Sequence, residues 1–163
     1  MAYQIRLARL EDLSCIEGIY AYARSFMAEH GNPDQWGTAY PPREMLLDDI
    51  SKQLLFVLCT EDTIHGVFYF YIGKDPTYGE IYGGSWRSDS TYGTIHRIAG
   101  DGSGGVLETA VAYCKQRCSH LRIDTHADNY VMQKAILKQG FSQRGIVYME
   151  DKTPRIAYDL IEI

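Results

Sequence analysis

The chain has 163 residues, of which 45% are hydrophobic and 23% are charged, and its formal net charge is −5. This length suits one domain over residues 1–163 with a sizeable core. The acidic balance and the lack of a basic stripe in the sequence argue against a nucleic-acid partner. The longest unbroken apolar run, LLFVLC at residues 54–59, has the length of a strand, so no membrane partner is expected.

The N-terminal sequence MAYQIRLARLED has no apolar segment of the kind found in secretory signals. The chain has four cysteines, and Cys114 and Cys118 share a face of an expected helix. They could form a metal or redox pair, but no histidine or second cysteine pair completes a zinc set, which favours two small hydrophobic residues and no metal. Reduced thiols without a secretory signal predict a cytoplasmic protein.

Hydrophobic periodicity predicts the elements in chain order. Strands are expected at residues 3–8, 54–60, 64–73, 94–99, 120–126, 145–150 and 155–161, and helices at 10–30, 42–53, 106–118 and 129–139. Pro42 suits the first turn of its helix, and Gly140 follows the end of the last one. Two long connections, 31–41 and 75–93, are candidates for functional loops, because long ordered loops often carry function.

The sequence GDGSGG at residues 100–105 lies between an expected strand and an expected helix. A P-loop would need Lys and Ser or Thr next, and Val106 and Leu107 stand there. The spacing matches G-x-G-x-x-G, with Asp124 near the position of a ribose ligand, so an NAD(P)-binding oxidoreductase is one alternative. Against it, consecutive strands precede the motif, and few βαβ units follow it.

A coenzyme A site is the preferred interpretation of this loop. Free backbone N–H groups at a helix N-terminus bind a pyrophosphate, and Gly102, Gly104 and Gly105 leave them accessible. A flexible turn without a ligand is the plain alternative, although four glycines in six residues exceed what a turn requires. The residues of the loop and of the start of the helix that are expected to bind the cofactor are Gly100, Gly102, Ser103, Gly104, Gly105, Val106 and Leu107.

The element order over nearly the whole chain, and the motifs from about residue 94 onward, resemble the GNAT family of N-acetyltransferases. The helix NYVMQKAILKQGF matches the family at Asn129 and at Gly140-Phe141, and IHRIA, RIDTH, DN, GF and RIAY resemble a bacterial subgroup. The chain departs from the family at Gly102, where Arg or Gln is usual, and at Ile136, where a Tyr often acts as the acid.

The resemblance adds Ile98, Ala99 and Asn129 to the expected cofactor-binding residues, beside the pantetheine arm. It implies an α/β (α+β) fold with a mixed, mostly antiparallel sheet. A splayed parallel strand pair would lie at its centre, and about four helices would flank it. It also implies transfer of acetyl from acetyl-CoA by direct attack of a primary amine of a small molecule or peptide. A homodimer is a separate expectation. A non-catalytic acyl-CoA sensor with the same fold stays open because of Ile136.

Several residues could take part in this chemistry. His126 and His96 are the first candidates for the base, since histidine titrates near neutral pH, and Glu80 in the long loop is another. Each histidine could equally be a hydrogen-bonded core residue. Tyr130, Tyr148 or water could supply the acid in place of Ile136, and a backbone N–H at the end of strand 94–99 could stabilise the oxyanion.

The remaining predictions concern neighbours of this site. Trp36, Tyr40 and Trp86, together with Tyr92, are expected to wall the acceptor amine, or alternatively to anchor their loops. An ion pair of Asp124 with Arg97 or Arg122 is expected to hold the strands structurally. Asn129 is either a helix N-cap or, if Asp128 caps instead, a ligand of the pantetheine arm.

Overall fold

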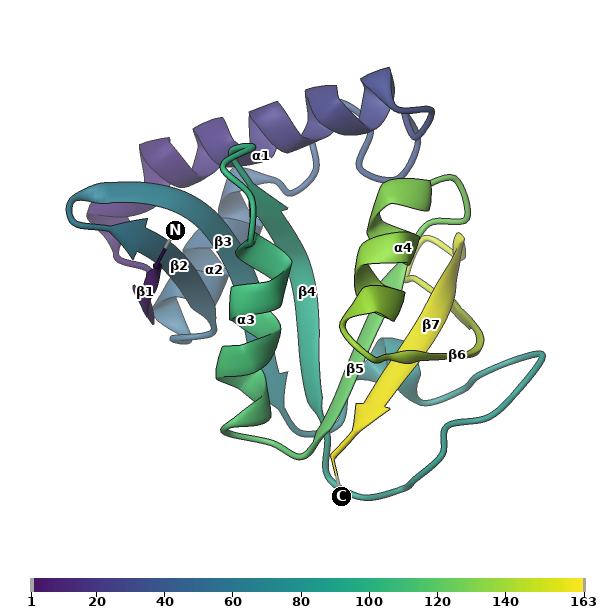
Figure 1. The fold of residues 1–163 in the computed structure, drawn as a ribbon. Coiled ribbons are helices and arrows are strands. Elements are labelled where there is room, and N and C mark those ends of the chain that lie inside the picture. Colours follow the sequence, from purple (N-terminus) through teal and green to yellow (C-terminus); the bar gives the residue numbers. More distant parts are fainter. Residues whose placement is uncertain (1, 163) are drawn as a thin grey trace.

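The strands form one mixed sheet in the order β1-β2-β3-β4-β5-β7-β6, in a computed structural model that describes residues 2–162 (Figure 1). The strands are β1 Gln4–Leu7, β2 Leu55–Thr60, β3 Thr63–Ile72, β4 Gly93–Gly100, β5 His120–Thr125, β6 Ser142–Tyr148 and β7 Pro154–Ile161. The α-helices are α1 Leu13–Glu29, α2 Arg43–Ser51, α3 Val106–Lys115 and α4 Tyr130–Lys138, and short 3-10 helices occupy Leu10–Asp12 and Pro76–Tyr78.

The predicted element order is confirmed, with shifts of one to three residues at most boundaries, and two of these shifts have a clear physical cause. Helix α1 starts at Leu13 instead of Leu10, because Asp12 binds Arg6 and the backbone N–H of Arg9 and holds the preceding turn in a 3-10 conformation. Strand β6 starts at Ser142, before the expected start at Gly145. Gly145, at φ 155°, lies where the register shifts, so the strand continues across a bulge.

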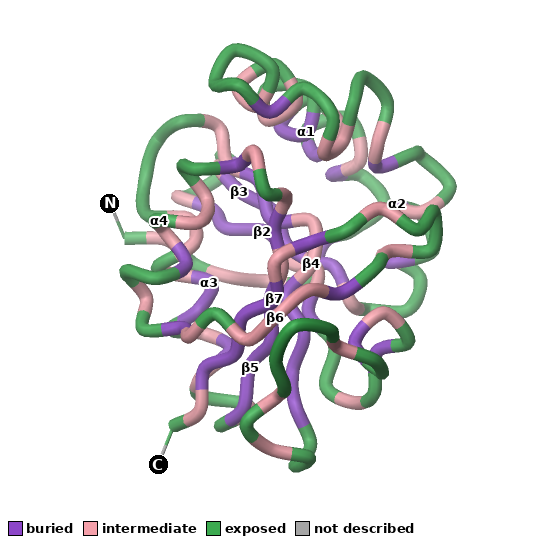
Figure 2. Tube along the Cα trace, turned by 90° about the vertical axis from the view of Figure 1, so that its right-hand side faces the viewer, coloured by how far each residue is buried: buried purple, intermediate pink, exposed green. Residues whose placement is uncertain are grey.

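Two hydrophobic clusters cover the two faces of the sheet. One contains the buried faces of α3 and α4, through Ala110, Val111, Cys114 and Ile136, and the other contains the buried face of α1 and part of α2, through residues such as Ile16 and Leu46. Figure 1 shows α3 and α4 side by side in front of the sheet and α1 across its upper end. The buried segments in Figure 2 follow the central strands, between these layers.

Strands β4 and β5 run parallel, and the other neighbouring strands described in the sheet pair antiparallel. The expected mixed sheet with a central parallel pair is therefore confirmed. The NAD alternative is wrong at the level of the fold, because a doubly wound dinucleotide fold needs a largely parallel sheet. Among the helices of residues 2–162, none has the length and apolar character needed to cross a membrane.

Candidate active site

The two parallel strands separate soon after they begin. Within residues 2–162, their register consists of Gly93 with Leu121 and Thr94 with Arg122. A bulge in β4 follows, where the pairing with β3 shifts and Arg97 takes φ 50°. Beyond Thr94 the edge of β4 that faces β5 has no ladder partner there, so its peptide groups border an open space.

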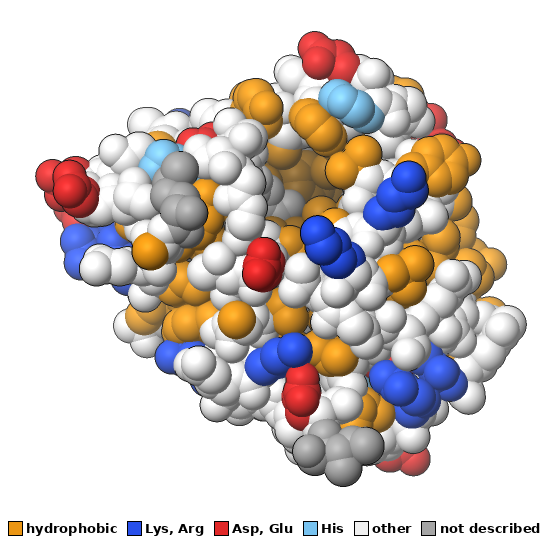
Figure 3. All heavy atoms as spheres, viewed as in Figure 1, with side chains coloured by type: hydrophobic (Ala, Val, Ile, Leu, Met, Phe, Trp, Pro, Cys, Tyr) orange, Lys and Arg blue, Asp and Glu red, His pale blue; other side chains and the backbone are white. Residues whose placement is uncertain are grey.

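A cavity of about 710 Å³ fills the space between the diverging strands. Figure 3 shows the molecule hollowed there, below α1 and beside α4, with apolar side chains in the depression. Ile95, Ile98, Ile123 and Met132 line it with apolar surface, and charged side chains from loop 75–93, β4 and β5 line another part. This size is typical of a site for a small molecule.

His96 lies among acidic side chains on the polar side of this cavity. Its Nε2 is 2.9 Å from Oδ2 of Asp75, and its Nδ1 is 3.6 Å from Oδ2 of Asp124. The hydroxyl of Tyr78 donates to the same oxygen of Asp124 at 2.6 Å. The bond to Asp75 fixes the ring, and since a carboxylate accepts, Nε2 is assigned the proton and Nδ1 is the nitrogen free to accept one.

Asp75 is the charged partner that sequence reasoning missed. It is the N-cap of the 3-10 helix Pro76–Tyr78 and accepts from the Thr77 backbone N–H at 2.9 Å. Burial alone would raise the pKa of Asp75, but the hydrogen bond and charge of His96, together with Thr77, lower it to about 2. The Asp-Pro-Thr sequence carried the signal of a cap, yet nothing in it pointed to His96.

Tyr78 is fully buried beside Asp124. Burial, and then the charge and hydrogen bond of Asp124, raise the pKa of Tyr78 well above its usual value. The phenol therefore stays protonated and donates to Asp124 throughout the ordinary pH range. This bond orients the carboxylate that faces Nδ1 of His96.

Asp75→Asn is expected to lower the free energy of unfolding by about 2 kcal/mol above pH 4, because a pKa lowered by nearly two units stabilises the folded state when the carboxylate is charged. This difference should shrink as the pH falls from about 4 towards 2, where wild-type Asp75 takes up its proton. Urea unfolding of both proteins across this range measures it. If the difference in unfolding free energy stayed constant down to pH 2, the lowered pKa of Asp75 would not be its cause.

The glycine loop leads directly into α3, as the sequence predicted. Gly102, Gly104 and Gly105 all have positive φ, at 92°, 90° and 74°, and α3 begins at Val106 without a side-chain cap. The first N–H groups of this helix are therefore free of a side-chain acceptor of their own. A Cβ on Gly102 would lie 2.6 Å from the hydroxyl of Tyr22. The residues fit an anion such as the pyrophosphate of coenzyme A.

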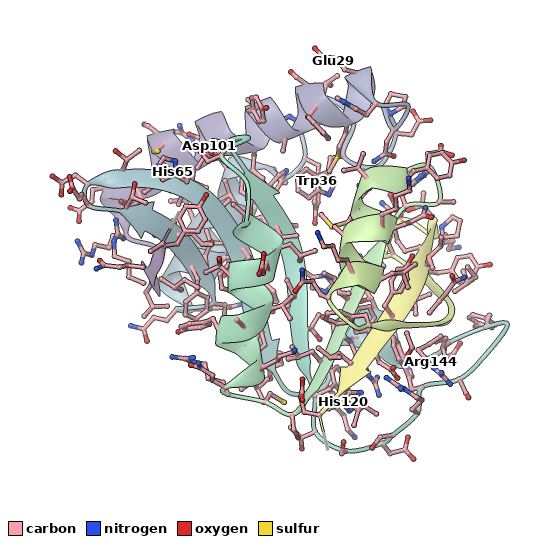
Figure 4. The ribbon with its side chains drawn as sticks, in the orientation of Figure 1. Glu29, Trp36, His65, Asp101, His120 and Arg144 are labelled. Carbon is pink, nitrogen blue, oxygen red and sulfur yellow. The ribbon has the colours of Figure 1, made fainter. Side chains whose placement is uncertain are left out.

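The loop is anchored by contacts at both ends. The Tyr3 hydroxyl donates to the carbonyl of Gly104 at 2.6 Å, and Asp101 accepts from the Ser103 backbone N–H and lies 2.8 Å from Nδ1 of His65. Figure 4 shows His65 and Asp101 next to each other above β3 and β4. This pairing brings a histidine from a separate strand to the one carboxylate within GDGSGG.

Of the catalytic candidates named from sequence, His96 lines the cavity, whereas His126, Glu80, Tyr130 and Tyr148 do not. His126 accepts from the Asp128 backbone N–H through Nδ1 at 3.0 Å. The side chain of Glu80 binds the hydroxyl of Tyr82 on the surface, and Tyr130 is 65% exposed at the start of α4. The structure therefore brings His96 alone among these candidates to the space between β4 and β5.

The aromatic candidates divide in the same way. Trp36 and Tyr40 line the cavity, and Figure 4 shows Trp36 between β4 and α4 below α1. Trp86 instead donates to the carbonyl of Tyr78 at 3.0 Å and stacks on Arg122, so it anchors loop 75–93. The Tyr92 hydroxyl accepts from the backbone N–H of Asp75 and positions the partner of His96.

Asn129 caps α4 and also lines the cavity. Its Oδ1 accepts from the Met132 backbone N–H at 3.0 Å, and its Nδ2 donates to Oε1 of Gln35 at 3.0 Å. The alternative in which Asp128 provides the cap is therefore wrong. Because both polar atoms of the side chain are engaged, Asn129 ties the 31–41 loop to the start of α4.

The expected ion pairs of Asp124 are also wrong. Arg97 binds Asp49 of α2 at 2.8 Å, and Arg122 lies between the rings of Trp86 and Tyr92. The bulge in β4 turns Arg97 towards α2, whereas period-two counting assumes an unbroken strand. Asp124 therefore interacts with Tyr78 and His96 instead.

The fold resembles those of solved acetyltransferases. A GNAT-family acetyltransferase from Streptococcus agalactiae superposes with a TM-score of 0.87 at 28% identity, over 99% of this chain and 96% of the other. A GNAT-family acetyltransferase from Listeria monocytogenes gives 0.71 at 14% identity, covering 98% and 95% of the two chains. An N-acetyltransferase from Staphylococcus aureus gives 0.61 at 18% identity, covering 99% of each.

The two more distant similarities show the fold alone, and the first also supports the resemblance to the GNAT family and acetyl transfer as the general chemistry. No family model matches the sequence, and no curated protein matches it. The narrower resemblance to a bacterial subgroup, through IHRIA and RIDTH, stays a prediction. Among residues 2–162, no three His, Cys, Asp or Glu side chains are grouped so as to hold a metal ion.

Proposed function

We propose that this chain is an acetyl-CoA-dependent N-acetyltransferase of the GNAT family in which His96 is the general base. One observation carries the proposal: the only predicted base that borders the opening between β4 and β5 is held there by a buried carboxylate. The acceptor is a primary amine, and acetyl-CoA supplies the acetyl group as a thioester. The glycine loop, at the N-terminus of α3, would hold the pyrophosphate.

The amine must be neutral before it can attack a carbonyl carbon, so one of its protons has to leave. Nδ1 of His96 would accept this proton, directly or through a water, while Nε2 keeps its hydrogen bond to Asp75. The resulting imidazolium would lie between the carboxylates of Asp75 and Asp124, which stabilise its charge. Asp75 is a positioning residue, in the manner of the acid in a Ser-His-Asp triad.

Backbone N–H groups of β4 beyond Thr94 border the opening and could donate to the thioester oxygen as it gains charge. The thiolate that leaves needs no strong acid, because thiols have an ordinary pKa of about 8.5. This matters because Ile136 is fully buried in the core and has no proton to give. Tyr130 and Tyr148 are both exposed, so solvent is the simplest source of this proton.

Thermal melting with acetyl-CoA, CoA and NAD, followed by thiol release with a panel of amines, tests the proposal. A ligand at about one hundred times its Kd should stabilise the folded state by roughly 2.7 kcal/mol. We expect stabilisation by acetyl-CoA and CoA, not by NAD, and thiol release that depends on an amine. Binding without turnover of any amine would favour an acyl-CoA sensor, and no binding would refute the proposal.

A further inference from the structure

Arg155, at the start of β7, is an unusually buried cation on the wall of the cavity. It is 8% exposed and lines the same space as His96. Arginine is rarely buried to this extent unless an anion or an aromatic face compensates its charge. Its environment therefore indicates what the cavity is built to receive.

The guanidinium of Arg155 donates to neutral oxygens. Nη1 lies 3.1 Å from the Thr153 hydroxyl and 3.0 Å from the carbonyl of Pro154, and Nη2 lies 3.2 Å from the carbonyl of Gln35. The acidic side chain of Asp151 is exposed and accepts a hydrogen bond from Thr153, and the charge of Arg155 contributes only in part to its lowered pKa. Among the ion pairs within 4.0 Å in residues 2–162, none involves Arg155.

Two other arginines with little exposure are compensated differently. Arg97 pairs with Asp49 at 2.8 Å, although both line the cavity. Arg122 lies 4.0 Å and 3.8 Å from the ring centroids of Trp86 and Tyr92. Arg155 differs from both. It is a buried guanidinium on the cavity wall, and among residues 2–162 neither an anion within 4.0 Å nor an aromatic ring compensates its charge.

The position of Arg155 relates it to the proposed base. In the register of β5 and β7, Ala157 is opposite Asp124, and Arg155 lies two residues before Ala157 on the same face of the sheet. Two strand positions span about 7 Å, which is the offset along the strands between Arg155 and Asp124, the carboxylate that faces Nδ1 of His96. A small molecule can bridge this span when its two ends make hydrogen bonds of about 2.8 Å.

We propose that Arg155 binds a carboxylate of the acceptor, so that the acceptor is a small amino acid with its amine near His96 and its carboxylate at Arg155. This inference rests on the proposed function. The acidic groups around His96 attract the ammonium form, and the guanidinium attracts the opposite charge, which together select a zwitterion. The cavity volume of about 710 Å³ suits a small acceptor beside the thioester arm.

The test compares the proteinogenic amino acids with their amides, which keep the amine and lose the negative charge. Thiol release from acetyl-CoA is measured for wild type, Arg155→Gln, Arg155→Lys and the control Arg144→Gln. Arg144 is a suitable control because it donates to the carbonyl of Ser85 and does not line the cavity. Binding of acetyl-CoA to each protein is measured separately by calorimetry.

We expect wild type to prefer free acids over their amides by about 10- to 100-fold in kcat/KM, as a charged hydrogen bond predicts. Arg155→Gln should remove this preference and change the amide rates little, Arg155→Lys should restore part of it, and Arg144→Gln should retain it. If Arg155→Gln fails to fold, the comparison of acids and amides on wild type decides alone.

Three results would overturn the inference while leaving acetyl-CoA binding intact. They are equal use of amides and acids by wild type, an equal fall of both series in Arg155→Gln, and turnover of neither series. A protein that binds no acetyl-CoA would instead refute the proposed function itself. The calorimetric measurement therefore separates the two failures.

Discussion

Replacing His96 with glutamine is expected to lower kcat for acetyl transfer by at least about 100-fold, the usual contribution of a general base. The glutamine amide can still donate a hydrogen bond to Asp75 from a similar position. Its nitrogen cannot accept a proton, however, as Nδ1 of His96 can. Steady-state thiol release gives kcat, and calorimetry should show an unchanged Kd for acetyl-CoA. The melting temperature should fall by no more than about 4 °C, which corresponds to roughly 1 kcal/mol for a chain of this size.

His126→Gln is the matched control for this experiment. His126 also follows a strand of the central pair, but it binds the backbone of Asp128 and lies outside the cavity lining. Its replacement should leave kcat within about threefold of wild type, which is a change of less than 1 kcal/mol in the barrier. Loss of activity in His126→Gln with activity retained in His96→Gln would reverse the assignment of the base.

Gly104→Val is expected to raise the Kd for acetyl-CoA by at least about 10-fold. Gly104 has φ 90°, a conformation that a β-branched residue adopts only under strain, so the loop must rearrange. Losing one charge-assisted hydrogen bond to a phosphate weakens binding by about 1.5–3 kcal/mol, which corresponds to a factor of about 10 to 100. Calorimetric titration with acetyl-CoA and with CoA measures the effect on each ligand.

Gly18→Ala controls for the loss of a glycine as such. Gly18 lies within α1, and a Cβ added to it would contact nothing within 4 Å. This change should raise the free energy of unfolding by about 0.5–1 kcal/mol, because alanine favours a helix, and it should leave the Kd unaltered. An unchanged Kd in Gly104→Val would mean that the loop does not hold the pyrophosphate.

The local features of the chain could be predicted from the sequence because they depend on residues that are close together in the chain. Period-two alternation placed the strands, helical spacing placed α1 and α3, and Gly140 marked the end of α4. The glycine loop at the start of α3 belongs to this group, because its conformation and the helix after it are both local. Two of the three-residue boundary errors, at Leu10 and Ser142, arose where a side-chain contact or a bulge interrupts the regular period.

The residues that make up the site were harder to predict from the sequence. His96 was one of several catalytic candidates named from the sequence, together with His126, which follows the other strand of the parallel pair. The bulge at Arg97 and the separation of the strands beyond Thr94 put His96 at the cavity instead. Neither feature leaves a clear periodic signal, since one extra residue in a strand looks like ordinary irregularity.

By itself, the sequence determined the order of the elements, the parallel pair implied by its resemblance to a family, and a glycine loop at a helix N-terminus. The element order and the glycine loop follow from backbone preferences and from periodic burial, which act over a few residues, whereas the parallel pair came from the family resemblance alone. Only the tertiary structure decided which charges meet: Asp75 with His96, Asp49 with Arg97, and no carboxylate within 4.0 Å of Arg155 among residues 2–162. The physical reason is that a buried charge takes whichever partner the packed fold brings within a few ångströms, and that partner can lie anywhere in the chain.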